Sequence, residues 1–234
     1  MRPAAPTGSN LRGNNRIASL RVSDTIQNMH NLRIESVDSP FDELGLASRT
    51  AAALSRADAM GLLRGQVTCL DFSALEELRS GMAEAGIGQV LVTELDHVRS
   101  CEPARLSALV VKIIEALEQS PVPTHEWPAL VQVLGLDLLI RLLGISPSSA
   151  RRYLSGERST PDAVAARLHF LALIAGDLAG AYNDIGVRRW FDRPRSRLGG
   201  ATPAEELGQE WSPEDPAAHG VRELASALVS SPAT

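Results

Sequence analysis

Hydroxyl and guanidinium side chains are concentrated between residues 146 and 158 of this 234-residue chain. Serine hydroxyls and arginine guanidinium groups are donors that contact phosphate oxygens and base edges in nucleic acids. A short helix that carries them on one face fits the major groove of a DNA duplex. We therefore predict a DNA-binding face that consists of Ser146, Pro147, Ser148, Ser149, Arg151, Arg152, Ser155 and Arg158.

Two short helices and a tight turn must position this face. The first, apolar helix is expected to end at Gly144, because glycine suits the left-handed turn of a tight helix connection. Ile145 is then expected to enter the core. Ser146 is predicted as the N-cap of the second helix and Pro147 as its first residue, with Gly156 at its end. The residues expected to face inward are Ala150, Tyr153 and Leu154, and the next helix is expected to run from Pro161 to about Tyr182.

This segment resembles an Xre-type (lambda-repressor-like) helix-turn-helix. The residues that carry the resemblance are Leu143-Gly144-Ile145-Ser146, Arg152-Tyr153-Leu154, Gly156 and Pro161. The resemblance implies base contacts from Pro147, Ser148, Arg151 and Arg152. It also implies a dimer that binds DNA half-sites about 34 Å apart. The alternative is an ordinary three-helix packing unit with a basic surface.

A second segment of interest covers residues 183–234. The apolar side of a predicted short helix, which Pro194 ends, consists of Val187, Trp190 and Phe191. Gly199 and Gly200 permit a sharp reversal of the chain. The residues predicted to form a capping box, with proline at the first helical position, are Thr202, Pro203 and Glu205. A last helix is predicted from the spacing of Val221, Leu224, Ala225 and Leu228.

The same segment resembles the toxin-binding domain of Xre/MbcA/ParS antitoxins. The carrying residues are Arg189-Trp190-Phe191, Leu198-Gly199-Gly200, Thr202-Pro203 and Glu206-Leu207. The resemblance implies a RES-domain toxin that consumes NAD, with an active site that the C-terminal part of the antitoxin occludes. The predicted partner-binding residues are Arg189, Trp190, Leu198, Gly199, Gly200, Thr202, Pro203 and Trp211. Pure core packing is the alternative for each apolar member of this set.

The N-terminal region predicts a small α/β unit. Strands are expected over residues 31–37, 66–72 and 89–93, and helices over 47–63 and 73–85, the latter with Ser73 and Glu76 as a capping box. The order β-α-β-α-β favours a small mixed or parallel sheet. The unit resembles a STAS-like domain in Ser48-Arg49 and Leu70-Asp71-Phe72-Ser73. A plain α/β scaffold is the alternative.

The predicted fold is mainly α in the C-terminal half, with a small α/β N-terminal domain. A helix with one apolar face is expected over residues 103–119. The proline-containing break at 120–123 is the predicted domain boundary, with Thr124 as the cap of the next helix. The predicted units are a flexible tail (1–30), the α/β domain (31–98), a connecting helix and linker (99–123), the helix-turn-helix domain (124–182) and the toxin-binding module (183–234).

The charge of the chain is unevenly distributed. The formal net charge is −5, yet residues 141–200 hold ten arginines against five acidic residues. Residues 201–234 hold one arginine against six acidic residues. The basic excess therefore coincides with the predicted helix-turn-helix, where DNA phosphates would be contacted.

Several function classes lack a motif in this sequence. Cys69 and Cys101 have neither the spacing of a zinc site nor the number for a disulfide framework. Phosphate-binding, dinucleotide-binding and nucleophile-elbow motifs are absent, so we expect no enzyme activity, no metal and no cofactor. No segment resembles a signal peptide or a membrane span. The expected location is the cytoplasm, in association with the nucleoid.

Two principal functions are compatible with these patterns. The first is an antitoxin of a type II toxin–antitoxin system, a homodimer that binds its own operator and neutralises a RES-type toxin. The second is a stand-alone Xre-family regulator, whose N-terminal domain senses a ligand or a partner. A third possibility is a scaffold that has lost DNA binding.

Overall fold

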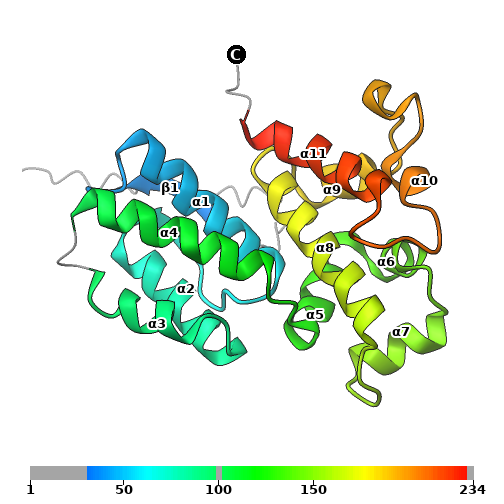
Figure 1. Ribbon diagram of the computed structural model, residues 1–234, viewed down its shortest axis with the longest axis horizontal. Helices are drawn as coiled ribbons and strands as arrows, with labels where there is room; N and C mark the ends of the chain where they lie inside the picture. The colour runs from blue at the N-terminus through cyan, green and yellow to red at the C-terminus, as the bar shows by residue number, and fades with distance from the viewer. Residues whose placement is uncertain (1–30, 99–101, 231–234) are drawn as a thin grey trace, which may run out of the picture.

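The structure is a computed structural model, and it describes residues 31–98 and 102–230 (Figure 1). Strands β1 (Leu32–Val37) and β2 (Val67–Leu70) form a two-stranded parallel sheet in which Leu32 lies opposite Val67. Helices make up most of the rest of the described chain, so the predicted fold class is confirmed. The predicted tail over 1–30 and Cys101 lie outside the described residues.

The helices form two groups in Figure 1, the first built around the sheet and the second around one long helix. The first group consists of α1 (Leu44–Ala59), α2 (Phe72–Ala85), α3 (Gln89–Leu95) and α4 (Pro103–Glu118). The second consists of α5 (Pro123–Leu134), α6 (Leu136–Leu143), α7 (Pro147–Leu154), α8 (Asp162–Ala179), α9 (Asp184–Phe191), the 3₁₀ turn η2 (Ser196–Leu198), α10 (Pro203–Leu207) and α11 (Pro216–Ser230).

The two groups share one hydrophobic core, because α1 packs against both α4 and α8. Gly176 of α8 permits the close approach: a Cβ atom there would lie 2.9 Å from the Cα of Arg56 on α1. Charged groups cross the same contact. The guanidinium of Arg56 lies 3.1 Å from Glu118 on α4 and 3.2 Å from Asp177 on α8, while Arg222 on α11 lies 2.9 Å from Glu118. Four helices are thus joined by one partly buried ion-pair network.

The predicted strand over 89–93 is wrong, because these residues begin helix α3. Gly88, with φ of +56°, turns the chain into the helix. Val92 and Leu95 are buried at helical spacing, while Val90 is 72% exposed. A short apolar run has no period that separates a strand from a helix. The β-α-β-α-β order consequently stops after its second strand.

Two predicted helix caps are also wrong. Helix α2 is capped by Asp71, whose Oδ1 accepts hydrogen bonds of 2.9 Å from the backbone N–H groups of Ser73 and Ala74. Aspartate caps a helix as well as serine does. Asp71 directly follows the end of β2 at Leu70, so the helix begins two residues earlier than a Ser73 cap would allow. Helix α5 begins at Pro123 after Val122, so Thr124 lies inside the helix and not at its cap. The break between α4 and α5 falls where the prolines predict it.

Candidate DNA-binding helix and partner-binding module

The turn between α6 and α7 has the predicted geometry. Gly144 has a φ of +64°, which L side chains rarely adopt, and a Cβ atom there would lie 2.0 Å from the carbonyl oxygen of Gln209. Ser146 caps α7, because its Oγ accepts a hydrogen bond of 3.2 Å from the Ser149 backbone N–H. Pro147 is the first helical residue, where its missing N–H costs nothing. The start of α7 is therefore rigidly defined.

The inner face of α7 is held by two buried side chains. Ala150 is fully buried, and the ring of Tyr153 packs against Trp127 of α5 with 6.1 Å between ring centroids. Trp127 in turn donates a hydrogen bond of 3.0 Å from Nε1 to Thr160 Oγ1. The prediction that Leu154 faces inward is wrong, since this side chain is 37% exposed. Successive side chains on an α-helix point about 100° apart. Leu154, which directly follows the buried Tyr153, therefore points away from the core.

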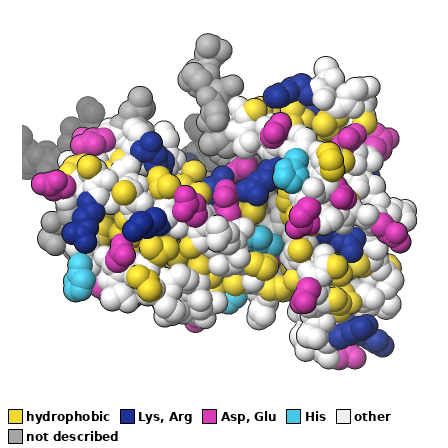
Figure 2. Space-filling view, viewed as in Figure 1, with side chains coloured by type: hydrophobic (Ala, Val, Ile, Leu, Met, Phe, Trp, Pro, Cys, Tyr) yellow, Lys and Arg dark blue, Asp and Glu magenta, His cyan; other side chains and the backbone are white. Residues whose placement is uncertain are grey.

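The outer face of α7 carries the predicted polar set. Of the eight residues, all are exposed except Ser149, which is half-buried. The hydroxyls of Ser148 and Ser149 each lie 3.0 Å from Ser146 Oγ and form a cluster at the helix start. Figure 2 shows basic side chains beside an acidic one at the end of the molecule where Figure 1 places α7.

The arginines of this face are lightly restrained. Arg152 Nε lies 3.7 Å from Glu157 Oε1, and both side chains are more than half exposed, so water screens the pair. Arg158 lies over the Tyr153 ring, 5.9 Å from its centroid. Arg151 forms no ion pair with any carboxylate of the described residues. The guanidinium groups can therefore turn toward phosphates or bases at little cost.

Three local features define the backbone of the C-terminal module, and two of them, the glycine reversal and the capping box of α10, are as predicted. Asn183 caps α9 by accepting a hydrogen bond of 2.9 Å from Gly186 N–H. Gly199 and Gly200 have φ values of +65° and +95°, which makes the sharp reversal possible. Thr202 and Glu205 form the reciprocal capping box of α10. The two caps and the glycine turn thus set where each helix of the module begins and where the chain reverses.

The predicted partner-binding residues divide by exposure. Trp190, Pro203 and Trp211 are buried, so they support the surface and do not form it in this conformation. Leu198 and Thr202 are half-buried. The exposed members, which a partner can touch directly, are Arg189, Gly199 and Gly200.

The module is fastened to the helix-turn-helix by the loop after α10. Trp211 Nε1 donates a hydrogen bond of 2.7 Å to the carbonyl oxygen of Leu142 at the end of α6. Arg167 of α8 joins the same two segments, because its Nη1 donates hydrogen bonds of 2.8 Å to Leu143 O at the end of α6 and of 3.3 Å to Gln209 O in the loop. The residues predicted for DNA and for a partner thus lie on one connected scaffold.

A buried acid–histidine pair that the sequence did not predict lies beneath the helix-turn-helix. Glu126 of α5 is fully buried, and its Oε1 lies 2.6 Å from Nδ1 of His169 on α8. His169 Nε2 lies 3.0 Å from the carbonyl oxygen of Glu118. Burial raises the pKa of the Glu126 carboxyl above its ordinary value, although the hydrogen bond with His169 acts in the opposite direction. No local pattern predicts a pair separated by 43 residues.

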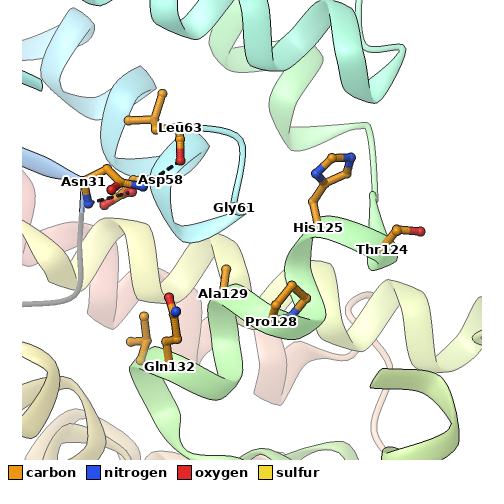
Figure 3. Close-up of a pocket in the computed structure, with 10 residues that line it drawn as sticks. Asn31, Asp58, Gly61, Leu63, Thr124, His125, Pro128, Ala129 and Gln132 are labelled. Carbon is orange, nitrogen blue, oxygen red and sulfur yellow. Dashed lines mark hydrogen bonds between the residues drawn. The ribbon is translucent and has the colours of Figure 1, made fainter. Parts of the chain in front are cut away.

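A cavity of about 220 Å³ lies between α5 and the N-terminal group (Figure 3). On one side Asn31 donates hydrogen bonds to Asp58 Oδ1 at 3.2 Å and to Leu63 O at 2.6 Å. On the other side His125 and Gln132 of α5 contribute polar groups. This cavity is a candidate ligand site that the sequence did not predict.

One group of side chains has ligand atoms close enough to hold a metal ion. Oxygen and sulfur atoms of Asp38, Cys69 and Asp71 lie within 4.8 Å of one another at the carboxyl ends of the two strands. Asp71 Oδ1 already accepts the capping hydrogen bonds of α2. Helix capping therefore accounts for the position of this carboxylate.

Comparison with protein-family models, curated proteins and solved structures finds no match to this chain. Among the described residues, no helix has the length and apolar character needed to cross a membrane.

Proposed function

We propose that this protein is a DNA-binding antitoxin that binds its own operator through α7 and neutralises a RES-type toxin through the module of residues 183–230. The observation that carries the proposal is the exposed hydroxyl and guanidinium face of α7, presented on a helix with a defined N-terminus. The toxin-binding part rests on the sequence resemblance of the C-terminal module.

In this proposal each end of the outer face has its own role. Ser146 lies at the N-terminus of α7, where its hydroxyl and the backbone N–H groups contact a phosphate, and Ser148 beside it faces the base edges. Arg151 and Arg152 lie further along the helix and contact base edges in the major groove. Arg158, beyond the helix end, contacts the backbone of the duplex. A homodimer would place two such helices on half-sites about 34 Å apart.

The stand-alone regulator is the second candidate, and the cavity in Figure 3 favours it. A ligand there would contact both Asp58 of α1 and His125 of α5. Because α5 also supports Tyr153 of α7 through Trp127, such a ligand would act close to the DNA-binding helix. In this candidate the C-terminal module serves dimerisation.

A co-purification experiment separates the two candidates. The tagged full chain is expressed together with its neighbouring gene, and we expect a RES-type protein to co-purify and its growth inhibition to be relieved. Arg189→Glu should abolish this association, because Arg189 is exposed on α9, whereas Arg105→Glu on α4 should leave it intact. Retained DNA binding by Arg189→Glu shows that the variant is folded. Purification of the wild-type chain without any partner contradicts the antitoxin function and leaves the regulator.

A further inference from the structure

Three arginines line one open cavity beside α9. The cavity has a volume of about 440 Å³, and its walls include Arg189 at the end of the helix and Arg193 and Arg195 just after it. Tyr182 and Ile185 contribute an apolar wall. A cavity of this size holds a small molecule.

Two buried donors at this cavity lack an acceptor among the described residues. They are Nε1 of Trp190, whose side chain is 1% exposed, and Nε of Arg195. The two side chains are in contact, with the Arg195 guanidinium 5.3 Å from the centroid of the Trp190 ring. Buried donors are nearly always paired in folded proteins, so each of these N–H groups needs an acceptor from outside the described chain, either water or an oxygen of a bound molecule.

The three arginines of the cavity, Arg189, Arg193 and Arg195, have no carboxylate partner in an ion pair within the described part of the chain. Asp192, which lies between them in sequence, is paired instead with Arg141 at 2.5 Å. An anion is therefore the group that this cavity would attract.

We propose that the cavity binds the phosphate group of a small molecule. Guanidinium groups present paired donors that match phosphate oxygens, and three of them suit a doubly charged phosphate better than a single carboxylate. Trp190 lines the same cavity, and its buried N–H has no acceptor in the described part of the chain. Tyr182 and Ile185 would contact the apolar part of the same molecule.

This site is separate from the DNA-binding face. Helix α7 precedes the start of α8 and α9 follows its end, and Figure 1 shows them at opposite ends of that helix. An 18-residue helix is about 27 Å long at 1.5 Å per residue. The cavity does share Arg189 and Trp190 with the predicted partner-binding set, so the test below uses Arg193, which lies outside that set.

Calorimetric titration of the full-length protein with inorganic pyrophosphate at 150 mM NaCl tests the proposal. We expect saturable binding by the wild type and at least a tenfold rise in Kd for Arg193→Ala. Arg193 is exposed, so the variant should fold. Arg197→Ala is the matched control, because Arg197 is an exposed arginine nearby that does not line the cavity, and its Kd should stay within twofold.

Four results would overturn the proposal. The first is no binding of pyrophosphate to the wild type, and the second is an equal loss in Arg193→Ala and Arg197→Ala, which would indicate general charge attraction. The third is succinate binding as tightly as pyrophosphate, which would assign the cavity to carboxylates. The fourth is a loss of DNA affinity in Arg193→Ala, which would assign the cavity to the DNA backbone.

Discussion

Trp211 Nε1 donates a hydrogen bond of 2.7 Å to the carbonyl oxygen of Leu142. That oxygen belongs to the last turn of α6, where carbonyl groups have no partner within the helix. The ring of Trp211 also packs edge-on against Phe170 of α8, with 5.1 Å between centroids. One side chain of the C-terminal loop thus completes the first helix of the helix-turn-helix.

We expect Trp211→Phe to lower the free energy of unfolding by about 1–2 kcal/mol, because it keeps a ring but leaves the Leu142 carbonyl without its donor. Trp211→Ala should cost about 3–5 kcal/mol, since it also empties a buried site. Urea unfolding of both variants measures the difference. Equal stability of Trp211→Phe and the wild type would show that the hydrogen bond is not required.

Gly144→Ala should destabilise the protein by more than about 1 kcal/mol, because φ there is +64° and the new Cβ would meet backbone at Gln209. Gly180→Ala is the control: φ is −67° and no atom lies within 4 Å of the new Cβ. This second change should leave stability unchanged or raise it by about 0.4–1 kcal/mol. Thermal unfolding compares the two, and a tolerated Gly144→Ala would contradict the turn geometry.

The buried Glu126 carboxyl predicts a pH dependence of stability. Because burial raises its pKa in the folded state, the folded protein binds more protons than the unfolded chain above the ordinary value of 4.5. Stability from this group therefore falls as pH rises from about 4.5 through the raised pKa. Glu126→Gln should remove this pH dependence of the free energy of unfolding. The stability of the variant relative to the wild type should therefore increase toward pH 8. Chemical unfolding across this range measures it, with exposed Glu115→Gln as control; an unchanged slope in Glu126→Gln contradicts the assignment.

Breaking the ion pair between α1 and α8 should be costly. Arg56→Ala leaves Asp177, which is 5% exposed, without its partner at 3.2 Å, and we expect a loss of about 3–5 kcal/mol. Arg33→Ala breaks the exposed pair with Glu35 and should cost less than about 1 kcal/mol. The double variant Arg56→Met/Asp177→Leu should recover much of the loss. A cost for Arg56→Ala no larger than that for Arg33→Ala would show that the network does not join the two helix groups.

The sequence predicted features that depend on neighbouring residues. Gly144, Ser146 and Pro147 occupy their expected places because a left-handed turn, an N-cap and a first-turn proline are each decided by one residue and its backbone. The capping box at Thr202 follows the same logic.

The sequence did not predict features that depend on the rest of the fold. Residues 89–93 form a helix because that conformation buries both Val92 and Leu95. A five-residue apolar run does not distinguish a strand from a helix by its sequence alone. Whether Trp190 and Trp211 are on the surface or in the core was equally undecided, since both types occur in each place. The pair Glu126–His169 joins distant segments and becomes visible only in the packed structure.

DNA binding by α7 is tested most simply by the affinity of Arg152→Ala for the DNA upstream of its own gene. Fluorescence anisotropy at fixed salt should show a loss of about 1–3 kcal/mol, which is roughly a 5- to 150-fold rise in Kd, and weaker discrimination against unrelated DNA. Arg105→Ala, an exposed arginine on α4, should bind within twofold of the wild type. If Arg152→Ala binds this DNA as tightly and as selectively as the wild type, α7 is not the DNA-binding helix.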